Sequence, residues 1–209
     1  MKERGMIFNG EMVRAILDGR KTQTRRPIKW KQTRFTEIGE REDGSKWPWS
    51  EDAEHACDFW HPCPFGAVGD RIWVRETWAD AGASAPDLKL YRANYPEHVP
   101  SIYENVPPAK EIRWTPSIHM PRTASRILLE ITDVRVERLN SISQEDAQAE
   151  GLELTGWRPT YSDPDSGGEV MTPYDNFAEL WSSIYGDESW QANPWVWVIE
   201  FKRVEGGAA

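Results

Sequence analysis

Hydrophobic positions along the 209-residue chain recur with two different periods, and the longer period predicts three helices. The first covers residues 9–19, where apolar side chains share one helical face and Gly19 suits the position just beyond the last turn. A second, short helix is predicted over 143–150, with Ser143 at its acidic start. The third covers 175–185 and ends before a glycine. Its apolar stripe consists of Phe177, Leu180, Trp181 and Ile184.

Alternation with a period of two predicts three strands. Residues 69–76 (GDRIWVRE) turn into a strand in which every second residue is apolar. The longest strand is predicted over 125–139, where the alternation changes phase at Thr132 and Asp133, as at a β-bulge. Residues 195–201 (WVWVIEF) predict a strand that is buried on both faces. Together these segments predict an α+β, mainly β fold, a small β-barrel with flanking helices.

Three long segments between these elements, 31–66, 79–124 and 153–173, show no clear period. They mix charges with Gly and Pro, so we expect irregular loops inserted into a single domain that spans 1–209. With 39% hydrophobic and 28% charged residues, the chain has the composition of a soluble globular protein. It contains no apolar run of transmembrane length and no apolar core of a secretory signal, so we expect a cytoplasmic protein without a membrane partner.

Positive charge is concentrated near the start of the sequence. Residues 1–35 contain ten Lys or Arg and three acidic residues, a net charge of +7 in a chain whose total is -9. An acidic protein with one basic segment does not coat nucleic acid indiscriminately, but it can bind one phosphate-bearing ligand there. We therefore expect a nucleoside, RNA or DNA ligand. The alternative is a helix and strand whose charges are simply solvated.

The segment 19–26 (GRKTQTRR) carries the first candidate chemistry. In an extended chain, alternate residues share a face, which separates Lys21 from Thr24 unless a turn after Gly19 brings them together. A lysine that its surroundings hold neutral can take the proton of a threonine hydroxyl. A basic strand with solvated side chains is the alternative.

Two further segments supply candidate groups. Glu150 ends a predicted helix and precedes a glycine, a position from which a carboxylate can project into a cleft. Residues 113–122 (RWTPSIHMPR) combine aromatic, histidine and arginine side chains, which suit base stacking and phosphate binding. The alternatives are a surface acid and a packed loop. The candidates for ligand binding are Arg20, Arg25, Arg26, Arg75, Trp114, His119 and Arg122.

Two histidines and two cysteines lie close together in the first long loop, and both residue types bind zinc. They are His55, Cys57, His61 and Cys63. Their spacing is not a standard zinc pattern, so we expect neither a metal nor another cofactor. The two cysteines do not indicate a disulfide framework either.

The order of these segments resembles the ASCH domain, a PUA-like β-barrel. Gly-Arg-Lys-Thr-Gln-Thr after the first helix, Gly-Asp before a strand, Glu-Gly after the short helix and a closing Val-Ile-Glu-Phe are the matching motifs. They are similar to those of small bacterial ASCH proteins that hydrolyse N4-acetylcytidine. The fuller pattern resembles ASCH-like proteins of phages and prophages. The resemblance covers roughly half the chain, at 6–28, 67–78, 125–152 and 174–203.

This resemblance implies a catalytic set of lysine, threonine and glutamate, which falls on Lys21, Thr24 and Glu150. Thr24 would attack an acyl carbonyl, Lys21 would act as base, and Glu150 would orient Lys21 or handle the leaving-group proton. Because a nearby carboxylate favours a charged lysine, an exchange of roles with Glu150 as base is a further option.

Two other functions stay open. The first is a non-catalytic PUA-like module that binds RNA or DNA through the arginines and the aromatic loop, with steep salt dependence. The second is a ribonuclease in which Lys21, His119 and Glu150 supply the acid–base groups.

Overall fold

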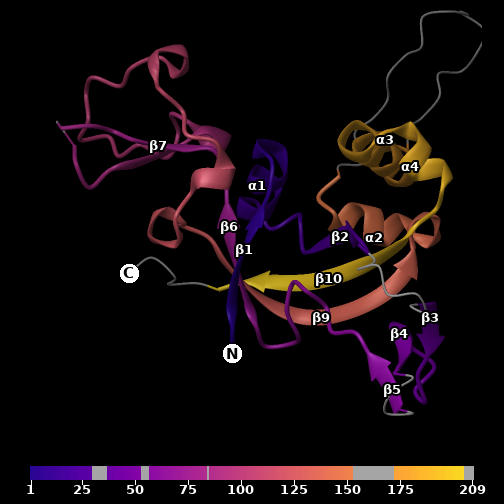
Figure 1. Ribbon diagram of the computed structural model, residues 1–209. Coiled ribbons are helices and arrows are strands. Elements are labelled where there is room, and N and C mark those ends of the chain that lie inside the picture. The colour runs from indigo at the N-terminus through magenta and orange to yellow at the C-terminus, as the bar shows by residue number, and fades with distance from the viewer. Residues whose placement is uncertain (30–36, 53–56, 84, 153–171, 205–209) are drawn as a thin grey trace, which may run out of the picture.

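A five-stranded mixed sheet organises the protein (Figure 1). The structure is a computed structural model that describes residues 1–29, 37–52, 57–83, 85–152 and 172–204. The strand order is β1-β6-β9-β10-β2, with β1 parallel to β6 and all other neighbours antiparallel. The strands are β1 (Glu3–Ile7), β2 (Gln23–Pro27), β6 (Arg71–Arg75), β9 (Leu128–Arg138) and β10 (Trp195–Arg203). The fold is therefore mixed and mainly β, as predicted, but the described strands form no closed barrel.

The two long strands β9 and β10 form a curved spine across the molecule (Figure 1). Their register pairs Glu200 with Asp133 and then Phe201 with Ile131, which leaves Thr132 as an extra residue in β9. The predicted change of phase at this point is therefore a β-bulge, which increases the local bend and twist of the strand.

Strand β10 is buried on both faces, because it separates two apolar clusters. Trp197 and Ile199 belong to the cluster that contains Val13 and Ile16 of helix α1 (Gly10–Leu17). Val196 and Val198 belong to a second cluster, with residues of α2 (Gln144–Ala149) and α3 (Pro173–Tyr185). The continuous apolar run of β10 therefore serves two cores, as its sequence predicted.

Side-chain caps define where the predicted helices begin. Asn9 accepts a hydrogen bond from the backbone N–H of Met12 at 2.8 Å, and Ser143 accepts one from Asp146 at 3.0 Å. Thr172 and Asp175 form a reciprocal capping box that starts α3 two residues before the predicted position. A further helix, α4 (Asp187–Gln191), was not predicted, since five residues are too few to show a helical period.

The prediction of irregular structure over 31–66 was wrong in its described part. An antiparallel sheet occupies it, made of β3 (Glu37–Glu40), β4 (Lys46–Asp52) and β5 (Cys57–Trp60). Trp47 of β4 packs edge-on against Trp197 at 5.0 Å and lies under the Arg41 guanidinium. Pro48 and the adjoining charges hid this strand, because they interrupt the expected apolar alternation.

Short elements fill the second long segment, which was predicted to be loop-like. A hairpin of β7 (Trp78–Asp80) and β8 (Lys89–Tyr91) is followed by single 3₁₀ turns. These turns are η1 (Arg92–Asn94), η2 (Ala109–Glu111), η3 (Ser117–His119) and η4 (Arg122–Ala124), with η5 (Leu139–Ser141) after β9. Residues 153–171 of the third segment lie outside the described residues.

None of the helices in the described ranges has both the length and the apolar character needed to cross a membrane.

The junction between α1, β2 and α2 depends on Gly151. Its φ is +93°, and a Cβ there would lie 2.7 Å from Cβ of Ala15 and 2.9 Å from Cβ of Lys21. We predict that Gly151→Ala lowers the free energy of unfolding by about 1–2 kcal/mol for the positive φ, with roughly 1–3 kcal/mol more for overlap.

Urea unfolding measures this effect, and Gly19→Ala is the matched control. Gly19 has a φ of +76° with nothing within 4 Å of the added Cβ, so only the conformational cost applies there. Equal losses for the two variants would contradict the tight junction.

Candidate functional site

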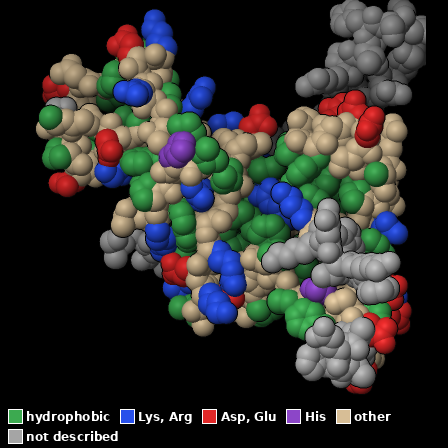
Figure 2. Space-filling view, in the orientation of Figure 1, with side chains coloured by type: hydrophobic (Ala, Val, Ile, Leu, Met, Phe, Trp, Pro, Cys, Tyr) green, Lys and Arg blue, Asp and Glu red, His purple; other side chains and the backbone are tan. Residues whose placement is uncertain are grey.

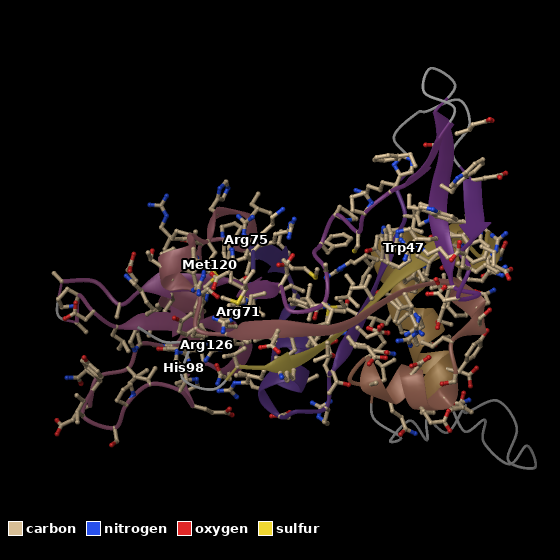
Figure 3. The ribbon with its side chains drawn as sticks, turned by 90° about the horizontal axis from the view of Figure 1, so that it is seen from below. Trp47, Arg71, Arg75, His98, Met120 and Arg126 are labelled. Atoms are coloured by element: carbon tan, nitrogen blue, oxygen red, sulfur yellow. The ribbon has the colours of Figure 1, made fainter. Side chains whose placement is uncertain are left out.

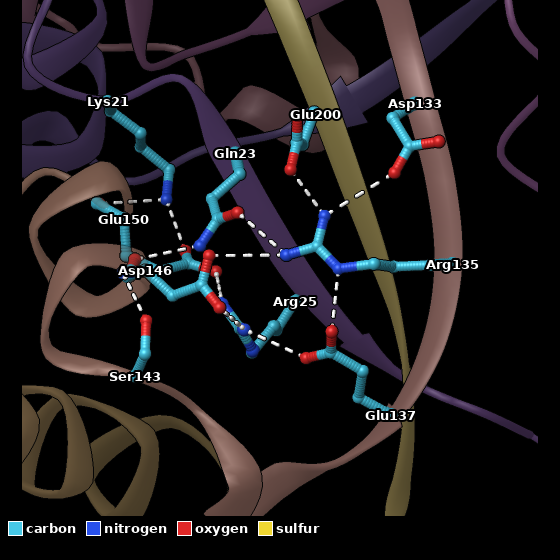
Figure 4. Close-up of polar contacts among 10 residues, drawn as sticks. All are labelled: Lys21, Gln23, Arg25, Asp133, Arg135, Glu137, Ser143, Asp146, Glu150 and Glu200. Carbon is cyan, nitrogen blue, oxygen red and sulfur yellow. Dashed lines mark hydrogen bonds and ion pairs between the residues drawn. The ribbon is translucent and has the colours of Figure 1, made fainter.

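A buried ion pair joins the residues just before β2 to the end of α2. Lys21 Nζ donates to Glu150 Oε2 at 2.6 Å and to the Glu150 carbonyl oxygen at 2.9 Å. The exposed fractions of the two side chains are 0% and 3%. The backbones also meet, because Lys21 and Glu150 form an isolated antiparallel bridge. The turn at Gly19 and the end of α2 thus place the predicted lysine and glutamate together (Figure 4).

Arg25 completes a three-residue core around the Glu150 carboxylate. Its Nη1 donates to Glu150 Oε1 at 3.3 Å, and its Nη2 contacts carboxylates of Asp146 at 3.0 Å and Glu137 at 3.2 Å. Gln23, between them on the same strand face, donates to the Asp146 carbonyl at 2.7 Å. The predicted alternation that puts Lys21, Gln23 and Arg25 on one face is confirmed.

Arg135 of β9 extends this network toward solvent (Figure 4). It donates to Glu137 at 2.6 Å and to Asp146 at 3.2 Å, and it also contacts Asp133 and Glu200. Partial burial acts to raise the pKa of Asp146, but the positive charges of Arg25 and Arg135 outweigh it and hold that pKa below its usual range.

Burial also shifts the pKa of Lys21. Desolvation lowers the pKa of Lys21 below its ordinary value, and the positive charges of Arg26 and Arg25 act in the same direction. The Glu150 carboxylate opposes this by attraction and by its hydrogen bond, but the net direction is downward. A lysine with a lowered pKa is suited to exchange protons nearer neutral pH.

Thr24 does not join this pair in the described structure. Its register partner is Ile199, which belongs to the α1-side cluster, so its side chain lies on the strand face opposite Lys21 and Arg25. No hydrogen bond between described residues links Thr24 to Lys21 or Glu150. The turn at Gly19 therefore brings Lys21 to Glu150 rather than to Thr24.

A pocket of about 590 Å³ adjoins the pair between α1 and α3. Ligand pockets span about 300–1,000 Å³, so this volume can hold a nucleoside-sized molecule. Arg20 lies at the pocket and donates to the Gly151 carbonyl at 2.7 Å. The polar residues that line the pocket include Asn9, Glu11, Arg14, Glu150, Asn176 and Glu179. Glu150 is thus shared by the buried network and the pocket.

The remaining predicted ligand-binding residues lie elsewhere. Arg26 donates to the Ile7 carbonyl at 2.9 Å and stacks over Phe8, which ties β2 to the end of β1. Arg75 donates to the Ser117 carbonyl at 3.2 Å, and Arg122 pairs with Glu3 at 2.9 Å. Trp114 donates to the Ala109 carbonyl, and His119 ends η3 with an exposed side chain. Figure 2 shows Lys and Arg side chains in small groups over one face rather than in one block.

The predicted histidine and cysteine group is only partly described. His55 lies outside the described residues, as does the side chain of Cys57. His61 shares a 2.8 Å hydrogen bond with Ser50 Oγ, and Cys63 is a buried free thiol whose pKa burial raises to about 11. In the described ranges, no group of three or more His, Cys, Asp or Glu side chains is arranged to hold a metal ion.

Sequence reasoning missed a second polar cluster beside β6 and η1. Arg126 holds the buried Glu76 carboxylate through hydrogen bonds of 2.9 and 3.0 Å and also contacts Asn94 at 2.9 Å. His98 accepts from the Tyr91 backbone N–H and bonds Asn94 O, and burial lowers the pKa of this histidine. In Figure 3 the labelled Arg126 and His98 lie far from Trp47. No motif marks this cluster, because Glu76, Arg126 and the segment 91–98 lie far apart in the sequence.

Comparisons with known proteins do not identify these sites, so their interpretation depends on their chemistry alone. A scan against protein-family models found no match, and neither did searches of curated proteins and of solved structures.

The network predicts a pH dependence that Asp146 controls. Because its folded-state pKa is lowered, Asp146 stabilises the fold above its ordinary pKa of 3.8, and that contribution is lost as the pH falls through the lower folded value. We predict that Asp146→Asn lowers the urea midpoint at pH 7 and that its deficit relative to the wild type shrinks below pH 3.8. A deficit that is constant down to pH 2 would contradict this role.

Proposed function

We propose that the chain is an ASCH-type protein with a variant of the PUA-like barrel, and that it hydrolyses an acyl amide on a modified nucleoside of the N4-acetylcytidine type. The order of elements supports the assignment: α1, the Gly-Arg-Lys-Thr-Gln-Thr segment, β6, a long bulged strand, a short helix that ends at Glu150, and the closing strand. The contact between Lys21 and Glu150 is the pairing that the resemblance implies.

The observation that carries the proposal is the double position of Glu150. Its carboxylate is bound by Lys21 at 2.6 Å and by Arg25 at 3.3 Å, and the same residue lines the 590 Å³ pocket. Acid–base groups of enzymes are often found where a buried residue with a shifted pKa, here Lys21, contacts a carboxylate that belongs to the lining of a concave pocket.

The chemistry that fits this geometry is hydrolysis by a water molecule from the pocket. Glu150 takes one proton from the water, whose oxygen bonds to the acyl carbon. The carbon–nitrogen bond then breaks, and the proton passes from Glu150 to the departing exocyclic nitrogen. The products are a carboxylic acid and the unmodified nucleoside. Lys21 fixes the orientation of the carboxylate and, with its lowered pKa, shares the transferred proton.

This scheme gives Thr24 no direct part, unlike the set that the resemblance implies. Its side chain belongs to the opposite strand face, so an attack by its hydroxyl with Lys21 as base would require β2 to rearrange. The nucleophile is therefore the point on which the two versions of the mechanism differ.

The two other functions have less support from the described residues. Lys21 and Arg25 are buried among carboxylates, so the basic segment does not offer these charges to a nucleic acid. For a ribonuclease, His119 would have to act with Lys21 and Glu150. His119 lies on η3, however, and Arg75 donates a hydrogen bond to the Ser117 carbonyl of that same turn.

We predict that the protein releases acetate from N4-acetylcytidine and that Glu150→Gln lowers kcat/KM by at least about 100-fold, the usual range for loss of an acid–base group. Thr24→Val is the matched control, because it removes the hydroxyl from a buried residue of β2, on the strand face opposite Arg25, while keeping its shape. It should retain activity within a few-fold. Chromatography of cytidine and circular dichroism of each variant provide the readouts.

Two outcomes would contradict this account in different ways. Absence of hydrolysis across a panel of acylated nucleosides would overturn the proposed function. Loss of activity in folded Thr24→Val would retain the function but assign the nucleophile to the threonine hydroxyl.

A further inference from the structure

A second, smaller pocket lies on the η1 side of α1. Its volume is about 220 Å³, below the roughly 300 Å³ at which pockets begin to hold whole drug-sized ligands, so it suits a small group rather than a nucleoside. It is lined by Gly10, Arg14, Glu76, Thr77, Arg92 and Ala93. Two arginines from different elements and one threonine therefore border a space of small-group size.

The one carboxylate in this lining is already neutralised. Glu76 is only 1% exposed, and Arg126 binds its two oxygens separately at 2.9 and 3.0 Å. The pair formed by Glu76 and Arg126 has no net charge, so Arg14 and Arg92 give the pocket a positive balance. A small, positively charged, donor-rich pocket favours an anion.

Both arginines have donors left for a ligand. Arg14 uses Nη1 to donate to the Ala93 carbonyl at 2.7 Å, which fixes its guanidinium across the pocket and leaves its other nitrogens available. The Arg92 guanidinium makes no hydrogen bond or ion pair with another described residue. Planar guanidinium groups match the geometry of phosphate oxygens, which they can bind through two parallel hydrogen bonds.

Arg14 also lines the larger pocket that contains Glu150. One side chain therefore borders the space proposed for the acylated base and the space that favours an anion. In Figure 1, helix α1 stands between the β7 hairpin and α3. Residues of α1 line both pockets. A ligand that occupies both pockets would carry a phosphate next to a nucleoside.

We propose that this second pocket is a phosphate subsite, and that the substrate is an acylated nucleoside 5′-monophosphate, free or at the 5′ end of an oligonucleotide. The choice of substrate rests on the proposed function. The phosphate subsite itself rests only on Arg14, Arg92 and the neutralised Glu76. The base and its acyl group occupy the larger pocket, and the phosphate binds the two arginines.

A substitution at Gly10 tests the smaller pocket by changing its volume and not its charge. A Cβ at this position would lie 3.6 Å from Nη1 of Arg14 and 3.8 Å from Cα of Ala93, which are ordinary contacts. Gly10→Ala therefore fills part of the pocket without a steric clash and without changing any charge.

The test is calorimetric titration of the full chain with cytidine 5′-monophosphate, cytidine and inorganic phosphate. We expect the monophosphate to bind at least tenfold more tightly than cytidine. Arg92→Gln and Gly10→Ala should each remove most of that difference, since each weakens or blocks the phosphate contacts. Arg203→Gln, the same charge change at an exposed position at the end of β10, should leave it unchanged.

Each outcome has a defined meaning. Equal affinities for the monophosphate and cytidine, or equal losses in Arg92→Gln and Arg203→Gln, would overturn the phosphate subsite. Phosphate binding that Arg92→Gln abolishes, without any cytidine binding or hydrolysis, would support the subsite while the proposed function fails. If the monophosphate binds more tightly than cytidine, a 5′-phosphorylated oligonucleotide that binds more tightly still, and more tightly than its unphosphorylated counterpart, would identify the source of the phosphate as a strand end.

Discussion

The buried contact between Lys21 and Glu150 is the interaction on which this part of the structure depends. It joins a strand and a helix that are more than a hundred residues apart in sequence, by both a backbone bridge and a 2.6 Å ion pair. Burying two charges is costly, and their attraction offsets that cost only where the remaining polar atoms are also satisfied. Arg25 and the Glu150 carbonyl provide further hydrogen bonds to the pair, while Nε of Arg25 is buried without a partner among the described residues.

The same contact accounts for the position of the larger pocket. Because Glu150 terminates α2 and Gly151 continues with a φ of +93°, the chain turns away at the end of the pair and leaves space between α1 and α3. The network therefore fixes one wall of the pocket. Arg14 on the facing helix then connects this wall to the smaller, positively charged pocket beside η1. The proposed acid–base chemistry and the proposed phosphate subsite both border Arg14 of α1.

Much of the sheet could be predicted from the sequence, because period and caps are local signals. The helix after Asn9, the bulge at Thr132 and the doubly buried β10 all follow from patterns within about fifteen residues. The sheet around Trp47 was missed because a proline and charges interrupt its alternation, and its partner Trp197 is 150 residues away in the chain.

The candidate site divides in the same way. Strand alternation predicted that Lys21, Gln23 and Arg25 share a face, and the Glu-Gly helix end predicted an inward carboxylate. The contact of Glu76 with Arg126 could not be predicted, because the two residues are 50 positions apart in the chain. The contact of Tyr91 with His98 spans only seven positions, but it lies in a segment without a clear period. Strand alternation predicted that Thr24 faces away from Lys21. The sequence left open only whether a turn at Gly19 would bring the two side chains together.

The most direct test of the account is the pKa of Lys21, measured by NMR on protein with isotope-labelled lysine side chains. Because burial lowers this pKa while Glu150 raises it, we predict a value below 10.5 in the wild type and a still lower value in Glu150→Gln. A Lys21 pKa at or above 10.5, or one that Glu150→Gln leaves unchanged, would contradict the buried pair as the centre of the site.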